Sequence, residues 1–328
     1  MSKVYVQRGN FNVDRRFFVR KVMALVCKER LPWYHRLYSS ILKVGPIPKH
    51  LAFIMDGNRR YAVKKHVERI EGHSQGFDKL AEVLQWCQEL GVEEVTVYAF
   101  SAENFKRSKE EVDSLMELAR TKFERILKEK DKLEELGVRL CVVGELDMLP
   151  DSLQTLAKQL ITTTKNNYKC KLNVCAAYTS RLEMTQAVRD IKWGVDEGLI
   201  YVSDISERLM DKTLQIPKVD LLIRTSGEVR LSDFLLWQSS LSYLSFLRHL
   251  WPEMTIWDFY GAILLYQQSY KYKKQEEEEH EEELRKEELM MVSNENNQEE
   301  ALKMRKNRIN NFIIKLNEKR LANCMTDS

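Results

Sequence analysis

The sequence predicts an α/β fold: a central, mostly parallel six-stranded sheet flanked by helices. Short apolar runs alternate with helical patterns through residues 46–262, as they do in parallel sheets that carry helices on their faces. Polar motifs follow three of these runs, at the strand ends where open α/β sheets bind ligands. Both ends of the chain differ in composition from this central part, so we divide the chain into residues 1–45, 46–262 and 263–328.

Six apolar runs are expected to form the strands. They cover residues 51–55, 95–100, 138–143, 172–178, 219–223 and 243–247. Helical patterns lie between them, at residues 76–90, 149–166 and about 181–194. Ser108 and Glu111 have the spacing of a capping box, which predicts the start of a further long helix that runs towards Gly137.

The composition excludes several classes of protein. The 52 basic and 49 acidic residues nearly balance, at a formal net charge of +3, so we expect no nucleic-acid partner. The six cysteines lack zinc or CxxC spacing, and several lie in apolar runs, which indicates free thiols in a reducing compartment. No stretch reaches the ~18 apolar residues of a spanning helix, and no clean signal peptide is present. A soluble or peripheral protein is expected.

Residues 1–45 form a basic, aromatic N-terminal extension. From Arg15 to Arg30, basic residues interleave with apolar ones, and apolar pairs then recur four residues apart up to Ile41 and Leu42. Such an amphipathic stretch lies in a membrane interface or packs on the protein's own core, and the pattern leaves both open. A transit peptide would be richer in serine.

Residues 263–328 form a charged C-terminal extension. Glutamates at 276–279 and 281–283 flank His280, and a basic amphipathic segment around Phe312 follows. One interpretation is a solvated helical extension, such as a helical hairpin. The other is a protein-partner or dimer contact through the second, amphipathic segment.

Residues 50–61 carry the most informative pattern. The first predicted strand ends in Asp56 and Gly57, and a helix then begins with Arg59 and Arg60 in its first turn. Arginines at a helix N-terminus are electrostatically unfavourable, but with free backbone N–H groups they form an oxyanion site that suits a diphosphate. A carboxylate beside a diphosphate suggests a shared Mg²⁺. The alternative is an ordinary strand–turn–helix with surface arginines and Asp56 as the helix N-cap.

Several blocks, in order along roughly residues 46–260, resemble the cis-prenyltransferases, the undecaprenyl and dehydrodolichyl diphosphate synthases. The blocks are Met-Asp-Gly-Asn-Arg-Arg-Tyr-Ala at 55–62, Glu-Gly-His at 71–73, Tyr-Ala-Phe-Ser-Ala-Glu-Asn-Phe at 98–105, Ile-Arg-Thr-Ser-Gly-Glu-Val-Arg-Leu-Ser at 223–232, Phe-Leu-Leu-Trp-Gln at 234–238 and Leu-Trp-Pro-Glu at 250–253. The eukaryotic catalytic subunits of the family are the most similar.

The resemblance implies a hydrophobic tunnel in the fold and a transferase that condenses isopentenyl diphosphate repeatedly onto farnesyl diphosphate with Mg²⁺. The product would be a long polyprenyl diphosphate for dolichol synthesis and protein glycosylation, made at the cytosolic face of the endoplasmic reticulum membrane by a peripheral protein. A catalytically inactive paralogue with a regulatory or scaffolding role is one alternative. A generic phosphate-binding α/β protein is another, although the sequence has neither a Walker A motif nor GxGxxG.

Motif by motif, the resemblance assigns candidate site residues. The allylic diphosphate is expected to bind Gly57, Asn58, Arg59, Arg60, Arg69 and Arg107, and isopentenyl diphosphate to bind Arg224, Arg230 and Ser232. The candidates for catalysis are Asp56, His73, Ser101 and Asn104, and Asp56 is also the expected Mg²⁺ ligand. Neither Ser101 nor Asn104 is a strong base, so the departing diphosphate is a candidate proton acceptor. The residues that line the tunnel, or else pack in the core, are Phe100, Phe105, Phe234 and Trp237.

Two departures from the family pattern concern the metal and the subunits. Tyr243 stands where bacterial homodimeric members carry a metal-binding glutamate, so Asp56 is expected to be the only protein carboxylate on the metal. The Arg-x-Gly motif that ends single-chain members is absent from residues 259–328. Eukaryotic catalytic subunits share this absence and obtain the motif from a Nogo-B receptor-like subunit, so the resemblance implies the catalytic half of a heteromer.

Overall fold

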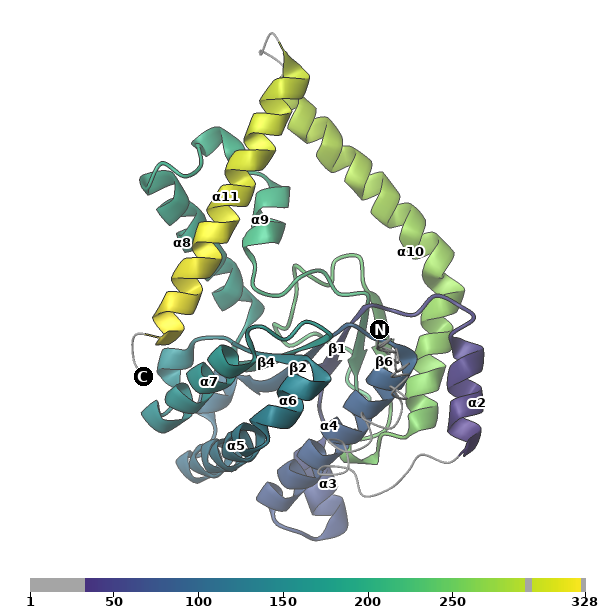
Figure 1. Cartoon of the computed structure of the whole chain (residues 1–328). Helices are drawn as coiled ribbons and strands as arrows, with labels where there is room; N and C mark the ends of the chain where they lie inside the picture. Colours follow the sequence, from purple (N-terminus) through teal and green to yellow (C-terminus); the bar gives the residue numbers. More distant parts are fainter. Residues whose placement is uncertain (1–32, 293–296, 326–328) are drawn as a thin grey trace, which may run out of the picture.

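The computed structural model describes residues 33–292 and 297–325 and has the expected α/β fold (Figure 1). Six strands form one sheet in the order β3-β4-β2-β1-β5-β6, and all neighbouring pairs run parallel. The strands are β1 (His50–Ile54), β2 (Glu94–Ser101), β3 (Val138–Val143), β4 (Cys170–Tyr178), β5 (Leu221–Arg224) and β6 (Tyr243–Phe246). The six predicted strands are confirmed, and the sheet is wholly parallel.

Strand β1 lies near the centre of the sheet because it is apolar on both faces. All five of its residues are buried. Leu51 and Phe53 belong to the core cluster that α4 (Arg69–Leu90) and α10 (Ile256–Met291) cover, whereas Ala52 belongs to a cluster on the opposite face. A strand that is buried on both faces gives a continuous apolar run, which is why it could be recognised in the sequence.

Helices cover both faces of the sheet (Figure 1). The other helices are α2 (Trp33–Leu42), α3 (Asn58–Lys65), α5 (Lys109–Lys128), α6 (Lys130–Leu136), α7 (Asp151–Thr164), α8 (Ser180–Asp196), α9 (Glu207–Thr213) and α11 (Gln298–Met325). Short 3₁₀ turns are η1 (Ala102–Lys106), η2 (Leu146–Met148), η3 (Val202–Asp204) and η4 (Trp251–Glu253). The short α9 was not predicted from the sequence.

Helix α4 begins earlier than expected, at Arg69 rather than at Gly76. Its first turns are polar, so the sequence gives no amphipathic signal there. These turns are fixed by close packing on α3 and not by an apolar face of their own. A Cβ at Gly72 would lie 2.5 Å from the main-chain oxygen of Asn58. The early start brings the Glu-Gly-His block at 71–73 into the helix.

The long helix expected from Ser108 towards Gly137 is two helices, α5 and α6, which meet at Glu129. The predicted start is confirmed, because the Ser108 hydroxyl accepts a hydrogen bond from the N–H of Glu111 at 3.4 Å. Gly137 ends α6 in the left-handed conformation, at φ 65°.

The two C-terminal helices run out from the sheet and back again. Figure 1 shows α10 leaving the body of the protein and α11 returning beside α8 and α9. Ile309, Phe312 and Leu316 of α11 are buried in one cluster with Ile191 of α8 and Leu209 of α9. The apolar face of the amphipathic segment therefore packs on this chain rather than standing free for a partner.

A buried ionic clasp fixes α11 to the body. The fully buried Asp204 accepts hydrogen bonds from Arg308 Nε and Nη2, both at 2.7 Å, and from Arg305 Nε at 3.3 Å. Burial alone would raise the pKa of Asp204, but the hydrogen bonds from Arg308 and from the N–H of Tyr201 hold the pKa below its usual value. The carboxylate is therefore ionised, and α11 is held by charge as well as by apolar contact.

Helix α2 is the described part of the N-terminal extension. Leu42 belongs to the main core cluster, and the main-chain oxygen of His35 accepts a hydrogen bond from the Tyr260 hydroxyl at 3.3 Å. The basic stretch predicted from Arg15 to Arg30 lies outside the described residues. Within 33–292 and 297–325, no helix is long and apolar enough to cross a membrane. The predicted division between residues 262 and 263 falls inside α10.

Candidate active site

The site begins where β1 ends. Gly57 has φ 112°, and a Cβ there would lie 3.0 Å from the Leu250 side chain, so only glycine fits this turn. The turn places Asp56 at the carboxyl end of the sheet and starts α3 at Asn58. Asn58 lies against α4: its Oδ1 is buried without a hydrogen-bond partner in the described part of the chain, and a Cβ at Gly76 would lie 2.3 Å from it.

Asp56 and Arg224 join the ends of two neighbouring strands, β1 and β5. Asp56 Oδ2 lies 2.8 Å from Arg224 Nη2 and 3.7 Å from Arg60 Nη2. Burial alone would raise the pKa of Asp56, but hydrogen bonds from Arg224 and Ser226 hold the pKa below its usual value. The carboxylate is therefore ionised at neutral pH. Thr225 fixes the main chain of Asp56, because its hydroxyl donates to the Asp56 carbonyl at 2.7 Å.

Arg224 is nearly buried and connects Asp56 to the loop that follows β5. Its Nη1 donates to Ser232 Oγ at 2.7 Å and to the carbonyl of Arg230 at 2.5 Å. Its Nε is buried without a partner among the described residues. The three residues expected to bind isopentenyl diphosphate therefore lie together.

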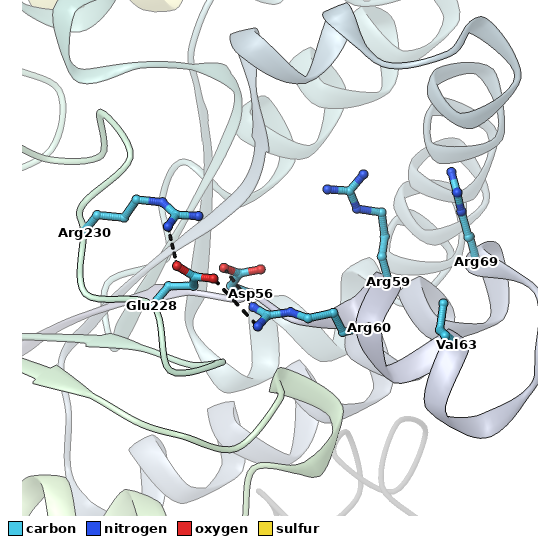
Figure 2. Close-up of a pocket in the computed structure, with 7 residues that line it drawn as sticks. All are labelled: Asp56, Arg59, Arg60, Val63, Arg69, Glu228 and Arg230. Atoms are coloured by element: carbon cyan, nitrogen blue, oxygen red, sulfur yellow. Dashed lines mark hydrogen bonds and ion pairs between the residues drawn. The ribbon is translucent and has the colours of Figure 1, made fainter.

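A pocket of about 490 Å³ opens beside Asp56 (Figure 2). It is lined by Asp56, Arg59, Arg60, Val63, Arg69, Glu228 and Arg230. It thus brings arginines from both expected diphosphate sites to one cavity, with two carboxylates among them. Four guanidinium groups around one cavity suit an anion of high charge, and diphosphate oxygens match their planar forks.

Glu228 bridges the two groups of arginines in this pocket (Figure 2). Its carboxylate accepts a hydrogen bond from Arg230 and lies 3.8 Å from Arg60 Nη1. Arg60 Nη1 also donates to the main-chain oxygen of Ser226 at 3.1 Å. The sequence did not single out Glu228, although it lies inside a recognised block and is the only carboxylate of residues 223–232.

Glu111 gathers the remaining arginines expected at the allylic site. Its carboxylate, on α5, lies 3.0 Å from Arg69 Nη1, 3.0 Å from Arg107 Nη1 and 3.8 Å from Arg59 Nη1. Burial would raise the pKa of Glu111, but the charges of Arg107 and Arg59 hold it below its usual value. The sequence identified Glu111 only as a capping residue, and nothing in its local pattern signals this second role.

His73 lies in the second turn of α4, close to the same charges. Its Nε2 is buried and has no hydrogen-bond partner among the described residues. Burial, followed by the charge of Arg107, lowers the pKa of His73 to about 4. The ring is therefore neutral at physiological pH.

Ser101 and Asn104 form a reciprocal cap at the end of β2. Ser101 Oγ accepts from the N–H of Glu103 at 3.1 Å, and Asn104 Oδ1 accepts from the N–H of Ser101 at 3.2 Å. Their side-chain oxygens are thus engaged in shaping the turn. They stand at the same sheet edge as Asp56 but do not line the 490 Å³ pocket.

Three of the four aromatic residues expected at the tunnel lie in packed clusters, and the fourth, Trp237, is partly buried. Phe100 and Phe105 belong to the cluster beneath α5 and α7, with ring centroids 4.9 Å apart. Phe234 is fully buried and stacks on Tyr98 at 4.4 Å, and Trp237 Nε1 donates to Asp211 at 2.7 Å. These contacts fit the core-packing interpretation.

Asp56 is the carboxylate of residues 55–62 that a metal ion could bind. Among the described residues, no group of three or more histidine, cysteine or acidic side chains could hold a metal. The ionised Asp56 nevertheless fits Mg²⁺, which commonly takes one or two carboxylates and completes its shell with phosphate oxygens and water. Tyr243 is paired with Leu221 at the amino end of its strand, so it lies at the edge opposite to Asp56.

Comparison with known proteins gives consistent matches. Residues 54–274 match the family described as "Putative undecaprenyl diphosphate synthase". A dehydrodolichyl diphosphate synthase complex subunit of Homo sapiens is 59% identical over 251 residues, which cover 76% of this chain and 75% of that protein. A complex subunit of the same description from Schizosaccharomyces pombe is 46% identical over 231 residues, covering 69% and 87%.

A solved structure shares the fold. Lavandulyl diphosphate synthase from Lavandula x intermedia, in complex with dimethylallyl diphosphate, aligns with a TM-score of 0.63 at 30% sequence identity. The alignment covers 67% of this chain and 95% of that chain.

Proposed function

This chain belongs to the cis-prenyltransferase family, and from that premise we propose that the sheet edge at Asp56 and Arg224 is its active site. The chain is a catalytic subunit that condenses isopentenyl diphosphate repeatedly onto farnesyl diphosphate, giving the long polyprenyl diphosphate used for dolichol and protein glycosylation. The observation that supports the site is one pocket lined by arginines from the segments that follow both β1 and β5.

The allylic diphosphate binds at the start of α3. Its ligands are the backbone N–H groups from Gly57 and Asn58 onward, with Arg59, Arg60, Arg69 and Arg107 around it. Glu111 holds three of these arginines in place before the diphosphate arrives. A preorganised set of donors stabilises the leaving diphosphate without reorganisation at the moment of reaction.

Isopentenyl diphosphate binds beside it, on Arg224, Arg230 and Ser232. Arg224 already touches the other two residues, so it fixes the spacing of the second site relative to Asp56. Two diphosphates repel one another, and holding both in one orientation converts a bimolecular step into a unimolecular one. The cluster of guanidinium groups offsets that repulsion.

Asp56 would hold a Mg²⁺, which would supply positive charge to stabilise the leaving diphosphate. The C1–O bond of the allylic substrate breaks, the double bond of isopentenyl diphosphate attacks C1, and a proton leaves the new chain. The His73 ring is neutral, so it contributes a hydrogen bond to the site and no positive charge. Because Ser101 and Asn104 are weak bases already engaged in a cap, the departing diphosphate accepts the proton.

The membrane contact is proposed to lie on α2 and the start of α10. Leu37 and Ile41 are exposed on α2, and the exposed Tyr38 packs edge-on against the exposed Trp257 of α10, with centroids 4.9 Å apart. Exposed aromatic and aliphatic side chains together are typical of interfacial segments. This face would hold the enzyme peripherally on the cytosolic side of the endoplasmic reticulum, where its apolar product is used.

The experiment is synthesis of polyprenyl diphosphate from farnesyl and labelled isopentenyl diphosphate with Mg²⁺. The full chain is assayed alone and with a Nogo-B receptor-like subunit that carries Arg-x-Gly, and Asp56→Ala is the matched control. Activity that needs the partner and is lost in Asp56→Ala is expected. Full activity of the chain alone would contradict the heteromer, and a folded, associated but inactive complex would favour an inactive paralogue.

A further inference from the structure

The loop that carries Ser232 has an unusual backbone. Ser232 and Asp233 are consecutive and both left-handed, at φ 52° and 57°, and neither is glycine. Such residues persist only where their surroundings hold them, and they concentrate at ligand sites. The question is therefore what holds this turn.

Asp233 closes the N-terminus of α8. Its main-chain oxygen accepts from the N–H of Ser180 at 2.7 Å. Its Oδ1 accepts from the N–H of Arg181 at 3.2 Å, and its Oδ2 accepts from Arg181 Nε at 2.7 Å. The first two N–H groups of the helix are thus satisfied from this one residue, and a carboxylate there also complements the helix dipole.

The same turn is held from two other sides. The Ser180 hydroxyl accepts from the N–H of Leu236 at 3.0 Å, and the Tyr98 hydroxyl lies 3.3 Å from the main-chain oxygen of Ser232. Ser232 Oγ faces Arg224 at 2.7 Å. Asp233 therefore stands between a rigid helix of 17 residues and the serine that meets Arg224.

We propose that Asp233 is a positioning residue for isopentenyl diphosphate, which holds Ser232 and Arg230 in their binding geometry by anchoring their loop to the N-terminus of α8. The proposal rests on the proposed function, since it assumes that Ser232 and Arg230 bind this substrate. Asp233 itself turns away to α8 and touches neither Asp56 nor Arg224 through any hydrogen bond or ion pair of the described residues.

Three variants separate anchoring from general stability. Asp233→Ala removes both side-chain contacts, whereas Asp233→Asn keeps an oxygen for the N–H of Arg181 and tolerates the left-handed conformation. Arg181→Ala removes only the contact to Oδ2, at a side chain that is 72% exposed, so it leaves the fold intact.

The measurement is initial-rate kinetics of the full chain, with its partner subunit if the wild type needs it, at fixed Mg²⁺. We expect Asp233→Ala to raise the KM for isopentenyl diphosphate about tenfold, the scale of one charge-assisted hydrogen bond, and to change the KM for farnesyl diphosphate less than about twofold. Asp233→Asn should restore most of the affinity, and Arg181→Ala should raise the same KM only about twofold.

An equal rise in both KM values, or none, would overturn the proposal. If Asp233→Ala fails to fold, Arg181→Ala decides it, since its rise in KM must be confined to isopentenyl diphosphate. Calorimetric binding of isopentenyl diphosphate gives the same comparison without turnover. A wild-type complex that makes no polyprenyl diphosphate would instead contradict the proposed function, so the two failures are distinguishable.

Discussion

The two edges of the sheet carry similar residues but use them differently. Asp56 follows β1 at the carboxyl edge, and Asp220 precedes β5 at the amino edge. Asp220 Oδ2 accepts from the main-chain N–H groups of Lys49 and His50, at 2.7 and 3.0 Å, and its Oδ1 lies 3.2 Å from the buried Lys273. At the amino edge, the carboxylate of Asp220 therefore has a structural role: it binds the main chain at the start of β1 and the side chain of Lys273.

The amino edge continues as a buried polar network. His50 Nε2 lies 2.7 Å from Thr96 Oγ1, and Asn173 Nδ2 donates to the same oxygen at 2.9 Å. Asn173 also donates to Glu94 at 2.7 Å, which Lys171 contacts at 2.8 Å. At the carboxyl edge, by contrast, half-exposed arginines line an open pocket, where a diphosphate can bind them while Glu111 holds them in place. A polar cluster is a candidate ligand site when its charged side chains face an open pocket. It is structural when those side chains bind main-chain groups.

The largest effect is expected from Asp56→Ala, which tests whether the carboxylate at the carboxyl edge is functional. We expect kcat/KM to fall at least about a thousandfold, the scale of losing a preorganised electrostatic contact in an active site, while the urea midpoint changes little. Arg224 keeps Ser232 and the Arg230 carbonyl as partners, which limits the loss of stability. Activity within tenfold of wild type would show that Asp56 is structural, like Asp220.

The converse variant is Asp220→Ala. It strands two main-chain N–H groups and leaves the buried Lys273 with Glu277 as its remaining carboxylate partner, so we expect the free energy of unfolding to fall by roughly 3 kcal/mol. Urea denaturation measures this loss. The KM values of the fraction that remains folded should match those of the wild type, and a selective change in either KM would mean that the two edges are not separate.

A smaller effect is expected from Glu111→Ala. Without this shared anchor, Arg59, Arg69 and Arg107 are no longer preorganised, and we expect the KM for farnesyl diphosphate to rise about tenfold. Glu117→Ala is the matched control, since Glu117 lies on the same helix and, within residues 33–292 and 297–325, pairs only with Arg120. Tighter binding in Glu111→Ala would mean that the carboxylate competes with the diphosphate.

The smallest effect concerns pH. Burial lowers the pKa of His73 to about 4, below the ordinary 6.5 of the unfolded chain, so acid favours unfolding. The contribution is complete above pH 6.5 and is lost as the pH falls from 6.5 towards 4. Between pH 7 and pH 5, His73→Gln should lose less stability than the wild type, by about 1 kcal/mol after allowance for partial exposure. If urea titrations show that wild type and His73→Gln lose equal stability between pH 7 and pH 5, the His73 ring is protonated in the folded protein as readily as in the unfolded chain.

Much of the fold could be predicted because the strands are buried on both faces. β1 and β5 are continuous apolar runs, and the polar motifs after them had to meet at one edge of a parallel sheet. The start of α4 could not be predicted, because the polar turn before Gly76 is stabilised by its fit against Asn58 rather than by its own pattern. Tertiary packing decides such segments.

The motifs predicted which arginines and which aspartate would meet at the carboxyl edge of the sheet, but not how their side chains pair. The motifs located Asp56, Arg60 and Arg224, whereas the sequence could not tell that Glu111 binds three arginines or that Glu228 bridges two. The contacts of Glu111 with Arg59 and Arg69, and of Glu228 with Arg60, join residues far apart in the chain and depend on how α5 and the loop after β5 are placed. The same limit hid the clasp between Asp204 and α11, which spans about a hundred residues.

The docking of α11 also sets an order for synthesis of the chain. The sheet and the active-site loops are complete by about residue 255, but Ile191 of α8 and Leu209 of α9 pack against Ile309, Phe312 and Leu316 of α11, which come later in the chain. At roughly 5–20 residues per second, a ribosome needs several seconds to add the intervening segment. During that interval the nascent protein presents an uncovered apolar face, which is a binding site for a chaperone and a risk of association with its neighbours.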